Sequence, residues 1–64
     1  MLYISYVAGT AGITKHQFDN FLIDVNEPQN EEDIKTLHKL AKEDIEKKTD
    51  AYVYDVSILN WKNV

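Results

Sequence analysis

The stretch NEEDIKTLHKLAKEDIEKK, residues 30–48, decides the fold because it is the longest periodic segment of the chain. Its apolar side chains recur every three or four residues, which is the period of a helix with one buried face. These positions are Ile34, Leu37, Leu40, Ala41 and Ile45. Pro28 disfavours helical backbone just before the stretch, and Asn30 is a good N-cap. The stretch therefore predicts one amphipathic helix that needs an apolar surface to pack against.

The charges of the stretch also suit a helix. Acidic residues occupy its first turn and Lys47 and Lys48 its last, which matches the helix dipole. Four pairs of opposite charge stand four residues apart, and each would add about 0.2–0.5 kcal/mol. They are Glu31 with Lys35, Lys39 with Glu43, Lys42 with Glu46, and Glu43 with Lys47. This charged side predicts the exposed face of the helix.

Three other segments are rich in the β-branched and aromatic residues that favour strands. They are residues 2–8, 16–25 and 51–61, whereas residues 62–64 are expected to fray. Residues 9–15, GTAGITK, supply turn chemistry for a hairpin between the first two strands. The helix then brings the third strand back beside the first. The sequence thus predicts one α+β domain over residues 1–64, β-β-α-β, with a three-stranded antiparallel sheet in the order 2-1-3 and one helix on one face.

Alternation along the strands assigns the side chains to the two faces of this sheet. Leu2, Ile4, Tyr6 and Ala8 share one face, and the set that contains Phe21, Ile23 and Val25 is expected to meet the helix. Strict alternation in the third strand separates Tyr52, Tyr54, Val56 and Ile58 from Val53, Asp55, Ser57, Leu59 and Trp61. Both faces carry large side chains, but one helix covers only one of them. The uncovered aromatic face is therefore a predicted interaction surface.

Size and composition point to self-association. A chain of 64 residues buries only about 60% of its unfolded surface, and small domains usually need an additional source of stability. The absence of cysteine excludes disulfides and thiolate metal sites, and two histidines are too few for a structural zinc site. Oligomerisation remains, so we expect a homodimer through the uncovered face or through a sheet edge.

The net charge of −4 and the absence of arginine argue against direct nucleic-acid binding and favour basic protein partners. The same charge also keeps a small protein soluble. The first residues lack the pattern of a signal peptide, and no apolar run is long enough to cross a bilayer. We therefore expect no membrane association and a cytoplasmic location.

The sequence predicts no catalytic residue, cofactor or metal. His16 stands too far along its strand from Asp24 for a hydrogen bond, and no nucleophile motif is present. Gly9 and Gly12 match a GxxG nucleic-acid clamp, but here the motif follows a strand in an acidic chain. The acidic clusters of the helix could hold a divalent cation or imitate phosphates. They lack the ligand spacing of a calcium loop, and a solvated helix face explains them.

Four short motifs span nearly the whole chain: ISY at 4–6, FDN at 18–20, Pro28 followed by EDI at 32–34, and ILNW at 58–61. In these motifs the chain resembles a group of very short proteins encoded by phages and prophages of Gram-positive bacteria. The segment before the second strand is less glycine-rich than the resemblance would imply. The resemblance implies a phage accessory protein, and such proteins often bind and block a host enzyme or defence factor.

We therefore expect a non-enzymatic binding protein that acts as a homodimer in the cytoplasm of a bacterial host. It would inhibit a defence or nucleic-acid-processing protein. The expected partner-binding residues are Tyr3, Thr10, Thr14, Lys15, His16, Tyr54 and Trp61. The alternative is a protein that sequesters a small ligand or nucleotide in a pocket between protomers, lined by tyrosine, threonine and Lys15.

Overall fold

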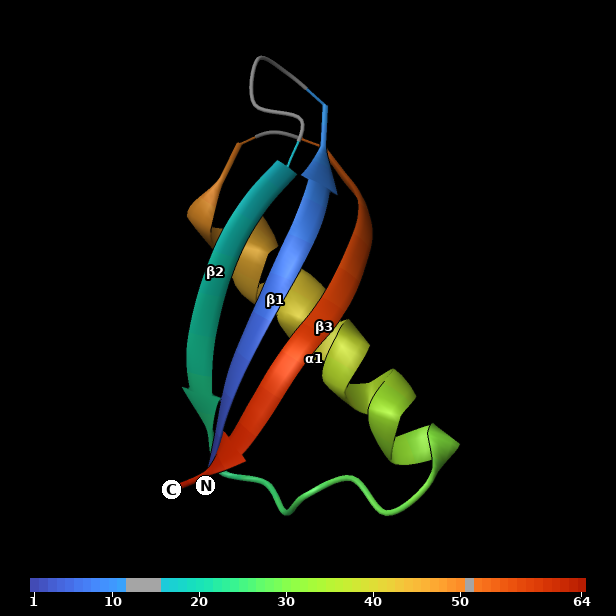
Figure 1. Cartoon of the computed structure of the whole chain (residues 1–64). Coiled ribbons are helices and arrows are strands. Elements are labelled where there is room, and N and C mark those ends of the chain that lie inside the picture. Colours follow the sequence, from blue (N-terminus) through green and yellow to red (C-terminus); the bar gives the residue numbers. More distant parts are fainter. Residues whose placement is uncertain (12–15, 51) are drawn as a thin grey trace.

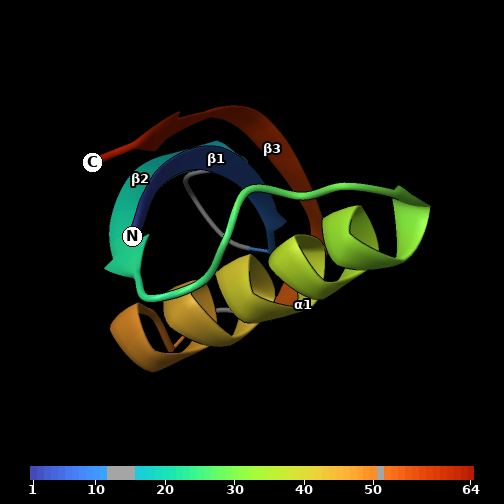
Figure 2. The same cartoon turned by 90° about the horizontal axis from the view of Figure 1, so that it is seen from below.

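The computed structural model describes residues 1–11, 16–50 and 52–64. The elements in chain order are β1 (Leu2–Thr10), β2 (His16–Ile23), α1 (Glu31–Lys48) and β3 (Val53–Asn63). The strands form an antiparallel sheet in the order β2-β1-β3, and α1 crosses one face of it diagonally (Figures 1 and 2). The predicted α+β fold, its sheet order and its single covered face are confirmed.

The helix begins and ends where its capping residues predict. The side chain of Asn30 accepts a hydrogen bond from the backbone N–H of Asp33 at 3.0 Å. The carboxylate of Asp33 in turn accepts from the backbone N–H of Gln29 at 2.9 Å. At the other end, the N–H of Thr49 donates to the carbonyl of Ile45 at 3.0 Å. These contacts satisfy backbone groups that a helix end leaves without partners.

The four ion pairs predicted along the exposed side of α1 are absent, so that prediction is wrong. The pair found within the helix is Lys48 with Asp44, at 2.8 Å, and Lys48 also reaches Asp19 on β2 at 3.3 Å. Exposed lysine and glutamate side chains gain little from pairing and lose rotamer freedom. Lys48 instead pairs where the last turn of α1 lies against the sheet.

The core lies between α1 and the inner face of the sheet, which is the face turned toward the helix. Its fully buried hydrophobic side chains are Leu2, Ile4, Tyr6 and Ala8 of β1, Leu37, Ala41 and Ile45 of α1, and Val53 of β3. Burying one leucine or isoleucine side chain is worth about 1.5–3 kcal/mol. As predicted, Phe21 and Ile23 of β2 point toward the helix and pack against the core, but both side chains are only half-buried. The inward side chains of the central strand β1 are therefore the most completely buried of the sheet.

Strict alternation fails in β3, so the predicted division of its side chains is wrong. The pairing with β1 shifts register at two places, which leaves Tyr54 and Leu59 without an opposite residue. Each β-bulge adds one residue and reverses the faces beyond it. The residues of β3 that lie opposite inward positions of β1 are Val53, Val56, Ile58, Trp61 and Asn63.

The strands also extend differently from the prediction at their ends. β1 continues through Thr10, and β2 ends at Ile23 rather than at Val25. β3 runs to Asn63, and the N–H of Val64 donates to the carbonyl of Met1 at 2.9 Å. The prediction that residues 62–64 fray is therefore wrong, because the start of β1 gives them backbone partners.

A polar contact joins the centre of the sheet to the last turns of α1. The hydroxyl of Tyr6 donates to Oδ2 of Asp44 at 2.6 Å, and Nζ of Lys48 donates to the same oxygen. The ring of Tyr6 also makes an edge contact with Phe21, with centroids 5.9 Å apart. Burial, followed by the hydrogen bond to Asp44, raises the pKa of Tyr6 far above its ordinary value. The hydrogen bond to Asp44 likewise raises the pKa of Lys48.

Replacing Tyr6 with phenylalanine should lower the free energy of unfolding by about 1.5–3 kcal/mol, the usual cost of losing a hydrogen bond to a charged group. Urea denaturation at neutral pH measures this loss. Tyr3→Phe is the matched control, because Tyr3 is 40% exposed on the other face and its change should stay below about 0.5 kcal/mol. Equal losses in the two variants would contradict the role of the Tyr6 hydroxyl.

The raised pKa of Tyr6 also predicts a pH dependence. Above a pH of about 10 the unfolded chain releases the tyrosine proton, whereas the folded chain keeps it. The unfolded state then binds fewer protons, so stability falls as the pH rises. Lys48 contributes with the same sign in both proteins, so the wild type should lose stability above pH 10 more steeply than Tyr6→Phe. Parallel profiles in urea denaturation would contradict this assignment.

Candidate functional site

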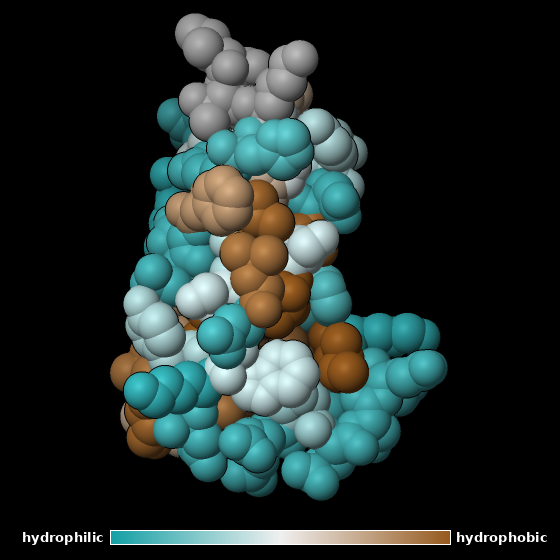
Figure 3. All heavy atoms as spheres, in the orientation of Figure 1, coloured by the Kyte–Doolittle hydropathy of each residue, from teal (hydrophilic) through white to brown (hydrophobic). Residues whose placement is uncertain are grey.

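The face of the sheet turned away from α1 is uncovered, and we call it the outer face (Figure 2). The pairing register and the burial pattern assign to it Tyr3, Ser5, Val7, Gly9, His16, Phe18, Asn20, Leu22, Asp55, Ser57, Asn60 and Lys62. Figure 3 shows this side of the molecule, where a band of apolar side chains runs between hydrophilic margins. The outer face is therefore the candidate functional surface.

Cross-strand pairs bring the apolar side chains of the outer face together. Phe18, which is 71% exposed, lies opposite Val7, and Leu22, which is 52% exposed, lies opposite Tyr3. Side chains directly opposite each other in an antiparallel pair are close enough to touch. These two pairs form an apolar surface over β1 and β2 that the polar pair of Ser5 and Asn20 divides between them.

A tyrosine from the first bulge of β3 extends this surface. The ring of Tyr54 lies over Gly9 so closely that a Cβ atom on Gly9 would be 2.9 Å from the ring. Tyr52 stacks on Tyr54 with the ring centroids 6.5 Å apart and the planes inclined by 28°. Because glycine has no side chain, it gives the ring of Tyr54 a flat place on the sheet. The bulge thus adds an exposed aromatic residue beside the apolar pairs.

The outer face is poor in charge. The chain has seven lysines and eleven acidic residues, yet among the residues assigned to this face only Asp55 and Lys62 are charged at neutral pH. Aromatic residues combined with few charges characterise the centre of protein–protein interfaces. The composition of the outer face therefore resembles an interface more than an ordinary solvated surface.

The structure separates the residues that the sequence singled out for partner binding. Tyr3, His16 and Tyr54 are exposed at the outer face. Thr10 is buried, with 3% of its surface exposed, so its side chain is not available to a partner. Trp61 lies opposite Ile4 and therefore on the inner face, where it stays 39% exposed at the edge strand. Alternation along the third strand predicted that Trp61 shares a face with Asp55 and Ser57, on the uncovered side, and this is wrong, because the bulge at Leu59 moves Trp61 to the inner face.

Thr14 and Lys15, on which the predicted ligand pocket between protomers also depended, lie outside the described residues. Phe18 and Leu22 were not selected from the sequence, although they are among the most exposed apolar residues of the outer face. Alternation along residues 16–25 already placed both on the side away from the helix, and that was the signal that could have found them.

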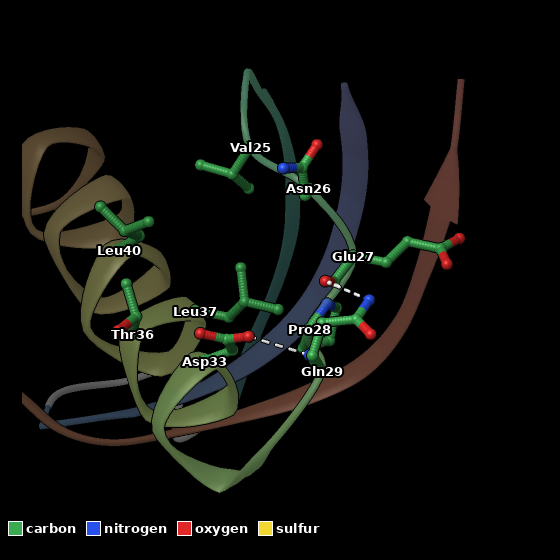
Figure 4. Close-up of a pocket in the computed structure, with 9 residues that line it drawn as sticks. All are labelled: Val25, Asn26, Glu27, Pro28, Gln29, Asp33, Thr36, Leu37 and Leu40. Carbon is green, nitrogen blue, oxygen red and sulfur yellow. Dashed lines mark hydrogen bonds between the residues drawn. The ribbon is translucent and has the colours of Figure 1, made fainter.

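A groove of about 310 Å³ lies on the other side of the molecule, between α1 and the connection that follows β2 (Figure 4). Val25, Pro28, Leu37 and Leu40 contribute its apolar lining. The carboxylate of Asp33, which lines the groove, accepts a hydrogen bond from the backbone N–H of Gln29. The side-chain amide of Gln29 donates to the carbonyl of Glu27 at 3.2 Å. The polar groups of the groove therefore hold the connection in place.

The described residues contain no group of three or more histidine, cysteine, aspartate or glutamate side chains that could hold a metal ion. Within the same residues, no helix is long and apolar enough to cross a membrane.

One edge of the sheet is closed by side chains. The N–H of Asn20 in β2 donates to Oδ1 of Asp19 at 2.7 Å, and its carbonyl accepts from Nζ of Lys48 at 3.1 Å. In an antiparallel pair alternate residues direct both backbone groups away from the neighbouring strand, and Asn20 is such a residue. Edges of this kind can accept a further strand unless they are blocked. Lys48 and Asp19 thus block the β2 edge at its middle.

Comparisons of the chain with protein-family models, with curated proteins and with solved structures found no match.

Replacing Lys48 with methionine should lower the free energy of unfolding by up to about 1 kcal/mol, because solvent screens a side chain that is 39% exposed. Lys47→Met removes the same charge from an exposed neighbour without an ion pair and should have little effect. Urea denaturation of both variants measures the difference. Equal stability of the two would show that the contacts of Lys48 contribute nothing.

Proposed function

We propose that this chain is a non-enzymatic protein-binding protein, which acts as a homodimer and binds a second protein through its outer face. The observation that carries the proposal is the apolar surface of Tyr3, Phe18, Leu22 and Tyr54, exposed on a charge-poor face that α1 leaves uncovered. Buried aromatic residues supply much of the binding energy in protein interfaces. Such a surface gains free energy when another protein removes it from water.

The shape of the outer face supports a different protein as its partner. The sheet arches over α1, so the outer face is convex (Figure 2). A convex surface fits a concave site on another protein, whereas two convex faces touch only over a small area. The arrangement suits a small protein that fills and blocks a groove on its target.

The charge distribution supports a basic target. The net charge is −4, and the first turn of α1 concentrates negative charge at Glu31, Glu32 and Asp33, away from the apolar surface. Such a field speeds the approach of a basic partner without forming the core of the contact. Basic surfaces are common on proteins that bind nucleic acid. Together with the resemblance to phage proteins, this makes a defence or nucleic-acid-processing protein of a bacterial host the proposed target, inhibited in the bacterial cytoplasm.

The proposal predicts that the immobilised chain retains a protein from a Gram-positive bacterial lysate in stoichiometric amount, and that Phe18→Asp weakens its binding at least about tenfold. Phe18 is highly exposed, so the substitution should leave the fold intact, which circular dichroism checks. Lys39→Gln is the matched control, because it makes the same change in net charge on the exposed side of α1.

Titration of the purified target against the three proteins measures the affinities. Equal affinity of Phe18→Asp and Lys39→Gln would show that the outer face is not the binding surface. The absence of any retained protein with the wild-type chain would remove the support for an inhibitor.

A further inference from the structure

We propose that the second copy of this chain joins through the free edge of β3, so that two sheets become one six-stranded antiparallel sheet with twofold symmetry. This inference rests on the homodimer of the proposed function and adds the surface that forms it. It leaves both outer faces free for another protein.

The remaining surfaces of the sheet favour this edge. The β2 edge is closed at Asn20 by Asp19 and Lys48, and the outer face is convex. β1 lies in the middle of the sheet, with β3 on its other side. The edge of β3 is therefore the edge of the described sheet at which side chains from α1 do not cap a backbone group.

The backbone groups that β3 offers can be assigned from its pairing. The N–H of Ala11 donates to the carbonyl of Tyr52, and the carbonyl of Met1 accepts from the N–H of Val64. The odd-numbered residues of β1 thus direct their backbone N–H and carbonyl groups to β3. Their partners in β3 direct the same groups back to β1. Val56 and Trp61 lie between those partners, so their N–H and carbonyl groups point to the free edge.

One register makes this edge complementary to itself. A twofold axis near Leu59 places Asp55 opposite Lys62 of the second copy, Val56 opposite Trp61, and Ser57 opposite Asn60. Symmetry makes every one of these pairs occur twice. Both members of each pair lie on the same face, because Asp55, Ser57, Asn60 and Lys62 are outward while Val56 and Trp61 are inward.

The bulge at Leu59 is what permits this match. Val56 and Trp61 are separated by an odd number of positions, so in an unbroken strand they would point to opposite faces. The extra residue at Leu59 brings them to the same face. The twofold axis passes between the Leu59 bulge of one copy and the Leu59 bulge of the other, and the pairs on either side of the axis stay regular.

The paired edge joins opposite charges and covers apolar surface. Asp55 and Lys62 are the two charged residues of the outer face, and the register sets each against the opposite charge. On the inner face, Trp61 is 39% exposed in the single chain and meets Val56 of the second copy. The first turns of α1 project past β3 on the inner side of the sheet (Figures 1 and 2), so the added strand would lie over these turns, which include the 37% exposed Ile34.

A charge exchange tests the register. Asp55→Lys and Lys62→Asp each set like charges opposite one another twice, so each should raise the dissociation constant of the dimer by about tenfold or more. The double variant restores opposite charges and should return to within about threefold of the wild type. Asp24→Lys is the control, since Asp24 is exposed beyond the end of β2 and its replacement changes the net charge as Asp55→Lys does. Sedimentation equilibrium measures the constants, and circular dichroism checks the fold.

A wild-type dimer whose single variants match Asp24→Lys would overturn the β3 interface but leave the homodimer of the proposed function standing. A wild type that is monomeric at every concentration would overturn both the interface and the homodimer. Binding of another protein by the outer face would still be judged by Phe18→Asp.

Amide hydrogen exchange followed by NMR gives an independent readout. In the dimer the amides of Val56 and Trp61 should exchange more slowly than in the Asp55→Lys variant, because strand pairing engages them. The N–H groups of Asp55 and Lys62 point to β1 and serve as internal references. The exchange of the Asp55 amide should change less between wild type and Lys62→Asp, and the exchange of the Lys62 amide should change less between wild type and Asp55→Lys. A wild-type dimer with unprotected Val56 and Trp61 amides would overturn pairing through β3.

Discussion

The polar contacts of Asp44 and Lys48 anchor the last turns of α1 to β1 and β2, beside the apolar core. Asp44 accepts from the buried hydroxyl of Tyr6, and Lys48 joins Asp44 to Asp19 and to the backbone of Asn20. These contacts hold the C-terminal end of α1 against β2, and the diagonal course of the helix then carries its first turns past β3 (Figure 1). Because the connection after β2 must bridge the space this leaves, a groove opens there. The same contacts close the edge of β2, whereas nothing from α1 caps the edge of β3.

The two bulges of β3 have as much influence on the surface as the helix does. The first places Tyr54 over Gly9, where its ring enlarges the apolar surface of the outer face. The second reverses the faces beyond Leu59, which moves Trp61 to the inner side and Lys62 to the outer side. A bulge costs regular pairing, since one residue is left without a partner. Here each bulge also changes which side chains a partner would meet.

In the proposed arrangement the surfaces of this small sheet have separate roles. The inner face forms the core with α1, the outer face meets another protein, and the edge of β3 meets a second copy. Such a division suits a chain of 64 residues, which has little surface to spare and whose core is small. Pairing two chains would lengthen the sheet and present two outer faces, which would increase the avidity for a target with two sites.

The sequence by itself determined the order of the elements, the sheet order and the inward face of β1, because these follow from local periodicity, capping residues and short connections. The bounds of α1 were predictable since Pro28, Asn30 and the charged ends act within a few residues. The positions of Tyr54 and Trp61 were not, because a bulge is set by how β3 fits β1 along its whole length, and alternation contains no signal for the added residue. Burial of Thr10 likewise depends on its pairing with Val53, which is distant in the chain. Tertiary structure also decided the partners of Lys48, since only the packing of α1 on β2 brings its ammonium group to Asp19 and Asn20.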